Sequence, residues 1–162
     1  MHNLNAKLPN KHILNAINSS LNYPHVNENS TSELDSHANM VVLCKDAFIF
    51  ELTGRTCNVE PFSPELEIAR DIPIVDAAIA YDCELTNETY ILIIRNALHI
   101  PSMIHNRLPP FILRQRGITV NDTARIHCSD PSTDDHCIIF PESDLRIPLK
   151  LNGIFSYFCK TT

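Results

Sequence analysis

A mainly β fold with one short helix is predicted by three observations on this sequence. Short runs of β-branched and aromatic residues recur along the chain, and Tyr90 to Ile94 is the most apolar of them. The 11 prolines outnumber the 3 glycines, which favours extended segments interrupted by turns. Pro109 and Pro110 precede an apolar stretch that Gly117 closes, as at a helix start and a glycine C-cap.

The expected elements follow the apolar runs in chain order. Strands are predicted at 41–44, 47–52, 57–62, 67–75, 77–81, 90–94, 97–100, 118–120, 137–140 and 146–151. Thr53 to Thr56, with Gly54 inside it, predicts a turn, and Thr86 to Glu88 predicts a hairpin turn. The short helix is expected from Phe111 to Arg116, within 109–116. Together these elements describe a β domain in which 90–94 is a central strand.

The chain of 162 residues is expected to hold one folded domain. Residues 1–31 are rich in Asn, Ser and His and lack a sustained apolar period, so they are predicted to be a flexible Asn-rich linker or tail. The apolar runs begin beyond this segment, and the domain is therefore assigned to 32–162.

Composition excludes several classes of protein. The net charge of −6, without any basic run, gives no electrostatic support for direct nucleic-acid binding, and Trp is absent. No apolar stretch approaches the length of a membrane span, and no signal-peptide pattern opens the chain. The six cysteines contain no CxxC pair, which fits reduced thiols. We therefore expect an intracellular, cytoplasmic protein with no membrane partner and no cofactor.

Asp35 is the main candidate for chemistry, because it directly follows Leu34 and precedes Ser36 at the start of the β-rich region. Aspartic proteases need a carboxylate on a tight turn beside a small hydroxyl residue. Two such carboxylates share one proton, so that one acts as acid while the other activates a water molecule. Taken alone, an Asp-Ser pair is more often an Asx-turn or a helix N-cap.

Several blocks in this order resemble the protease segment of copia-type retrotransposon polyproteins. Leu34 to Met40 is similar to the family's Leu-Asp-Ser-Gly-Ala followed by His-Met, and Asn96 to Pro101 is similar to its Asn-Val-Leu-Tyr-Val-Pro. One branch of the family has the sequence Glu-Leu-Asp-Ser-His-Ala at the first of these blocks. Two later motifs of that branch, Asn-x-x-Pro-Pro-Phe-Ile and Leu-Asn-Gly-x-x-Ser-Tyr-Phe, resemble Asn106 to Ile112 and Leu151 to Phe158. The resemblance covers Glu33 to Phe158.

This resemblance implies a retropepsin-like, closed β-barrel that supplies one catalytic aspartate per chain. Asp35 would be that residue and Ser36 its hydrogen-bonding neighbour. Two chains would pair as a homodimer about a twofold axis and bring the two Asp35 side chains together. The implied activity is that of an aspartic endopeptidase, and the implied substrate is a polypeptide, the parent polyprotein.

His37 departs from the family pattern, which has glycine at this position. Glycine lets a substrate backbone approach closely and permits unusual dihedral angles. The imidazole of His37 could fill the cleft, lower the pKa of the aspartate, or point away and help as a base. The sequence therefore leaves two hypotheses, an active endopeptidase and a catalytically inactive domain that serves as a dimerisation or scaffold module.

Two other sets of residues are candidates for chemistry, as zinc ligands and as a second aspartate. His127, Cys128, His136 and Cys137 could supply zinc ligands, but neighbouring residues of a strand point to opposite faces. Surface histidines beside buried cysteines are the preferred interpretation, so no metal site is predicted and a zinc module remains the weaker alternative. Asp76 is interpreted as a turn or surface residue because it lies too close in sequence to Asp35 for a second protease lobe.

Overall fold

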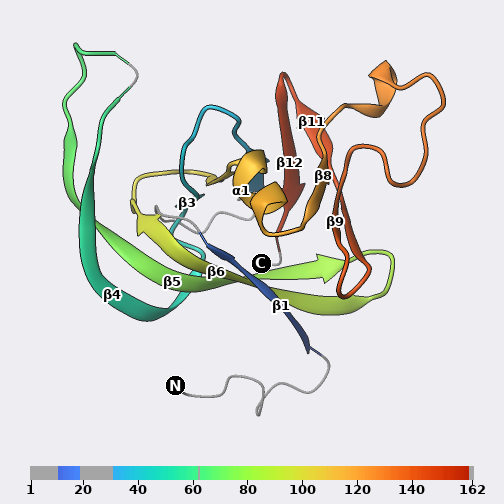
Figure 1. The fold of residues 1–162 in the computed structure, drawn as a ribbon, viewed down its shortest axis with the longest axis horizontal. Coiled ribbons are helices and arrows are strands. Elements are labelled where there is room, and N and C mark those ends of the chain that lie inside the picture. Colours follow the sequence, from blue (N-terminus) through green and yellow to red (C-terminus); the bar gives the residue numbers. More distant parts are fainter. Residues whose placement is uncertain (1–10, 19–30, 62, 161–162) are drawn as a thin grey trace.

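The computed structural model describes residues 11–18, 31–61 and 63–160, and this part of the chain is mainly β with one short α-helix (Figure 1). Its elements are β1 (Lys11–Asn18), β2 (Thr31–Leu34), β3 (Val42–Leu43), β4 (Phe48–Val59), β5 (Ala69–Cys83), β6 (Glu88–His99), β7 (Asn106–Leu108), α1 (Pro110–Gln115), β8 (Thr119–Asn121), a 3-10 turn (Arg125–His127), β9 (Cys137–Phe140), β10 (Leu145–Pro148), β11 (Lys150–Asn152) and β12 (Phe155–Cys159). The predicted fold class is confirmed at this level.

The strands form two sheets that do not close into a barrel. The larger sheet has the order β11-β12-β2-β7-β3-β6-β5-β4, with β1 paired to β6 outside this path, and the smaller one has the order β10-β9-β8. Closure would require the two end strands to pair. Among the described strands β11 and β4 do not pair, and Figure 1 shows β4 curving away on the side opposite β11 and β12. The closed barrel expected from the sequence is therefore not found.

Three long strands, β4, β5 and β6, form an antiparallel meander in which predicted breaks are absorbed as bulges. The predicted turn at Thr53 to Thr56 lies inside β4, where the pairing register with β5 shifts between Leu52 and Thr56. Gly54 has a φ of 72°, which suits a bulge, and the Thr53 hydroxyl donates to the Ile74 carbonyl at 2.6 Å. The turn prediction was wrong because the glycine bends the strand without reversing it.

Helix α1 confirms the predicted helix and its C-terminal glycine. Pro110 occupies the first turn, and Ile112 and Leu113 are buried. Gly117 has a φ of 75° and donates its N–H to the Arg114 carbonyl at 3.0 Å. The predicted hairpin turn is also present, because it joins β5 to β6, with the Asn87 N–H donating to the Cys83 carbonyl at 2.9 Å.

One main apolar core fills the space between the two sheets and α1. Its side chains with the least exposure include Leu43, Val75, Ile79, Ile94, Leu113, Ile138, Ile147 and Phe158. Phe158 meets Tyr81 edge to face, with ring centroids 5.8 Å apart. Because β12 contributes Phe158 and β5 contributes Tyr81, the last strand is packed into the body of the domain.

The predicted tail, residues 1–31, lies mostly outside the described residues. Within it, Lys11–Asn18 forms β1, which pairs in parallel with β6 from Thr89 to Arg95. Figure 1 shows β1 crossing the middle of the molecule beside β6. The division of the chain at residue 31 stays a prediction.

Candidate functional site at the Asp35 turn

Strand β2 ends at Leu34, and Asp35 begins the turn that follows it. The Asp35 N–H donates to the Leu108 carbonyl at 3.1 Å, which extends the parallel pairing of β2 with β7 by one bond. The carboxylate oxygen Oδ1 accepts the backbone N–H groups of His37 at 3.0 Å and Ala38 at 3.2 Å. The sheet therefore fixes the backbone of Asp35, and its own turn fixes the carboxylate.

Ser36 and His37 lie on the surface of this turn. Both residues are exposed, and the Ser36 hydroxyl lies 3.4 Å from Nδ1 of His37. Asp35 itself is partly buried. The structure thus brings the three predicted site residues together in one turn, with a single carboxylate per chain.

Buried Asn106 bonds strand β2 three residues before Asp35. Asn106 and Ser32 have no exposed surface, and the amide Nδ2 donates to the Ser32 hydroxyl at 2.9 Å. The amide oxygen of Asn106 accepts the backbone N–H of Cys44 at 2.5 Å. One side chain therefore connects β2, β7 and the loop after β3, and satisfies buried polar groups on all three.

A charged pair lies at Glu33, the neighbour of Ser32 on β2. Glu33 is buried, and its Oε2 pairs with the guanidinium of Arg107 on β7. The Arg107 guanidinium also lies 5.5 Å from the centroid of the Phe155 ring on β12. Successive residues of a strand face opposite sides, so Ser32 and Glu33 connect β2 to its neighbours on both faces of the sheet.

The hairpin of β4 and β5 has no glycine in the connection between its strands. Its last paired residues are Val59 and Ala69, and the connection between them contains Pro61 and Pro64. Leu66 and Ile68 on this connection are exposed. A pair of prolines restricts the backbone, so the connection is stiffer than a glycine-rich tip.

Asp76 is not the surface residue that the sequence suggested. It is buried on β5, where its carboxylate accepts hydrogen bonds from Arg95 at 2.6 Å and from the Asn96 N–H at 2.7 Å. The pairing of β5 with β6 shifts register between Val75 and Ala77, and Asn96 has a φ of 54°. Asp76 therefore lies opposite a β-bulge at Arg95 and Asn96 of β6, and it bonds the Asn96 N–H within that bulge.

The candidate zinc ligands do not converge. His136 is buried, against the prediction of a surface histidine, and its Nε2 lies 2.9 Å from the Ser156 hydroxyl. Cys137 is buried, whereas His127 is exposed on the 3-10 turn. Within the described part of the chain no group of three or more His, Cys, Asp or Glu side chains could hold a metal ion. The surface prediction is therefore right for His127 and wrong for His136, because β12, distant in sequence, supplies a hydroxyl partner to His136.

A pocket of about 280 Å³ lies away from the Asp35 turn. It is lined by Tyr81, Asp82, Glu84, Leu85, Pro148, Lys150, Phe158, Cys159 and Lys160. Cys159 pairs with Thr31 at the start of β2, whereas Asp35 follows the end of that strand. The pocket and the candidate site are therefore at opposite ends of β2.

Comparisons with family models, with curated proteins and with solved structures found no match for this chain. Among the described residues, none of the helices has the length and apolar character needed to cross a bilayer.

Asn106 and Glu33 are supporting residues that the sequence reasoning missed. Asn106 lies in an Asn-Arg-Leu segment that is too short to predict as a strand, and with His105 and Arg107 beside it nothing local marks it as buried. Glu33 gave no such signal, because its partner Arg107 is 74 residues away.

Proposed function

We propose that this chain is a retrotransposon-type aspartic endopeptidase of the copia class, with a retropepsin-like arrangement around Asp35. Asp35 supplies the carboxylate, Ser36 its hydroxyl neighbour, and a second copy of the chain the other carboxylate. The substrate is an extended polypeptide, with the parent polyprotein as the natural one. No cofactor takes part.

The observation that carries this proposal is the way in which Asp35 is held. Its backbone is bonded to Leu108 on the parallel strand β7, and two turn N–H groups bond Oδ1. This fixes the carboxylate at the edge of a rigid sheet and leaves Oδ2 for a second group. Two such carboxylates brought together would share one proton, because both cannot ionise at close range.

The chemistry follows from that shared proton. The ionised Asp35 would take a proton from a water molecule, which then attacks the peptide carbonyl, while the protonated Asp35 of the second copy would donate to the carbonyl oxygen. Activity would then follow a bell-shaped pH profile, because the pair needs one proton and not two or none.

His37 favours a second candidate function, a catalytically inactive dimerisation or scaffold module. Its exposed imidazole stands directly after the Asp-Ser pair, where a substrate backbone would have to approach. Such a module would keep the fold and the pairing of two chains without cleaving peptides.

The test is cleavage of a denatured polypeptide by the purified full chain between pH 3 and 7. We expect pepstatin-sensitive cleavage that Asp35→Asn lowers about 100-fold or more, because the amide cannot act as acid or base. Asp82→Asn is the matched control, since Asp82 is an exposed strand aspartate that bonds Thr89 far from the turn. It should leave cleavage unchanged.

His37→Gly separates the two candidate functions. We expect it to increase cleavage, because glycine removes the imidazole from the approach path. Cleavage that survives Asp35→Asn contradicts the proposal. A dimer that cleaves nothing, either as the natural chain or as His37→Gly, supports the scaffold function instead.

A further inference from the structure

A buried cluster of three reactive side chains lies where the C-terminal end of the chain meets the loop after β3. Lys160 follows β12, and its amine lies 2.5 Å from Oδ2 of Asp46 and 3.9 Å from Sγ of Cys44. The Cys44 thiol in turn lies 3.7 Å from the same oxygen of Asp46. One carboxylate oxygen therefore holds a thiol and an amine against each other.

The burial of this cluster distinguishes it from a surface ion pair. Cys44 has no exposed surface, and the side chains of Lys160 and Asp46 are 5% and 7% exposed. The second carboxylate oxygen of Asp46 is also buried and has no hydrogen-bond partner among the described residues. Lysine is rarely buried unless it is paired, and here its carboxylate partner also holds it beside a thiol.

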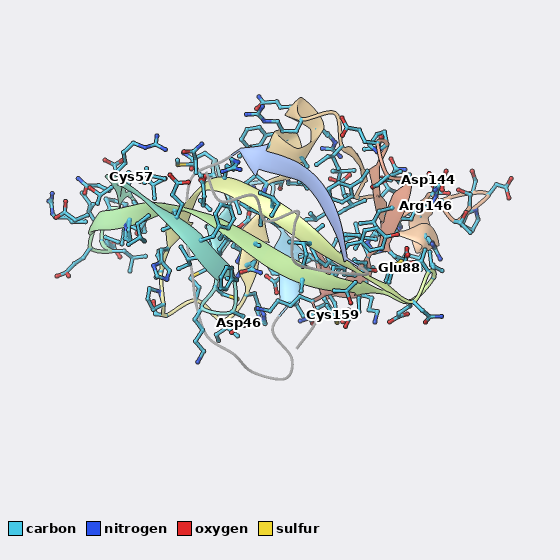
Figure 2. The ribbon with its side chains drawn as sticks, turned by 90° about the horizontal axis from the view of Figure 1, so that it is seen from below. Asp46, Cys57, Glu88, Asp144, Arg146 and Cys159 are labelled. Atoms are coloured by element: carbon cyan, nitrogen blue, oxygen red, sulfur yellow. The ribbon has the colours of Figure 1, made fainter. Side chains whose placement is uncertain are left out.

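The cluster borders a pocket. Lys160 and its neighbour Cys159 line this pocket of about 280 Å³, together with Tyr81 and Phe158. Figure 2 shows Asp46 and Cys159 along the same lower edge of the molecule. The amine of Lys160 lies 3.9 Å from the Cys44 sulfur, so one side chain of the pocket lining contacts the thiol.

We propose that Cys44 and Lys160 are a site of oxidative crosslinking, at which hydrogen peroxide converts the two side chains into a sulfur–nitrogen bond. In the first step the Cys44 sulfur attacks one peroxide oxygen. The O–O bond breaks, the sulfur is oxidised by two electrons to a sulfenic acid, and one water molecule leaves.

In the second step the Lys160 amine displaces the sulfenic hydroxyl. Asp46 Oδ2 takes a proton from the ammonium group, the nitrogen lone pair attacks sulfur, and the S–O bond breaks as the S–N bond forms. The departing hydroxide takes a further proton from nitrogen and leaves as the second water. Thiol, amine and one peroxide thus give a sulfenamide and two waters, and the chain loses two hydrogen atoms.

The crosslink would join positions 116 residues apart in sequence. It would fix the end of β12 to the loop that leads from β3 into β4, next to the Cys44 N–H that donates to the Asn106 side chain. A crosslink over so long a loop restricts the unfolded chain strongly. Oxidised protein should therefore unfold at a higher temperature than reduced protein.

The experiment treats the purified full chain with hydrogen peroxide at pH 7 and at pH 9, followed by mass spectrometry and peptide mapping. We expect a product two hydrogens lighter, in which the peptides that contain Cys44 and Lys160 are joined and which dithiothreitol separates. Burial raises the pKa of the Cys44 thiol, so the reaction should be faster at pH 9, where more thiolate forms.

Three variants control this experiment. Lys160→Arg keeps a cation for Asp46 but should abolish the link, and Cys44→Ser should do the same. Cys159→Ser should leave it intact and excludes a disulfide, which would also remove two hydrogens. A product with oxygen added on Cys44 and Lys160 free, or a disulfide from Cys44 to Cys159, overturns the proposal. Because no step uses Asp35, this result is independent of the protease assay.

Discussion

Asp35 and Asp76 are two aspartates held in opposite ways by the same sheet. Asp35 is partly exposed, and both hydrogen bonds to its carboxylate come from its own turn. Asp76 is buried, and its bonds come from Arg95 and Asn96 on the neighbouring strand β6. A carboxylate that serves the fold is thus bonded across strands, whereas one that is held only locally remains available for chemistry.

The largest expected effect is a loss of folding stability when Asp76 is substituted. Asp76→Ala should lower the free energy of unfolding by about 3 kcal/mol, because it leaves the Asn96 N–H without an acceptor and Arg95 without its partner. Asp35→Asn should change it by about 0.5 kcal/mol or less, since the amide oxygen can still accept the turn N–H groups. Urea unfolding of the purified variants measures both values.

The variant Asp76→Asn extends this comparison of unfolding free energies. It keeps an acceptor for Asn96 but loses the charge that pairs with Arg95, so its cost should lie between the other two. Equal losses for Asp35→Asn and Asp76→Ala would show that the two carboxylates do not differ in structural role.

A smaller effect is expected for Asn106, which connects β2 to the loop after β3. Asn106→Ala should destabilise the fold by about 2 kcal/mol, because the Ser32 hydroxyl and the Cys44 N–H both lose a buried partner. Ser32→Ala removes only one of these bonds and should cost about 1 kcal/mol by chemical denaturation. A cost for Asn106→Ala no greater than that for Ser32→Ala would contradict the role assigned to the bond with Cys44.

The smallest effect is a loss of stability in mild acid. Burial lowers the pKa of His99 to about 4 and also lowers the pKa of His136. Both are therefore neutral in the folded state at a pH where the unfolded chain already binds a proton. Stability from this source should be constant above about pH 6.5 and fall toward pH 4, with a loss on the order of 1 kcal/mol from His99 at pH 5.5.

Thermal unfolding between pH 7.5 and 5 measures this loss. His136→Gln can keep the hydrogen bond with the Ser156 hydroxyl but cannot titrate, so it should flatten part of the pH dependence. If the unfolding temperature of His136→Gln changed with pH in the same way as that of the natural chain, the burial of His136 would have no effect on the pH dependence of stability.

The elements that the sequence predicted well are those determined by local residues. Pro109, Pro110 and Gly117 delimit α1 because proline and glycine restrict the backbone wherever the chain goes. The β5–β6 hairpin follows from the turn at Thr86 to Glu88 between two apolar runs.

The elements that the sequence did not predict depend on partners distant along the chain. Strands β2, β7 and β12 are short, and each is defined by its pairing with another segment. The burial of Asp76 depends on a bulge that local residues do not reveal. Likewise the placement of Asp35 at a turn was predictable, but the bond from Asn106 to Ser32, 74 residues away, was not.

The parallel pairing of β2 with β7 also determines the order in which the molecule can fold. Ser32 and Asn106 are 74 residues apart, and the whole β4–β5–β6 meander lies between them. Adjacent hairpins close small loops and form early, whereas a contact of this sequence separation must first overcome the entropy of a large loop. We therefore expect the bonds from Asn106 to Ser32 and from Asp35 to Leu108 to form after the meander, whereas the local bonds within the Asp35 turn do not depend on it.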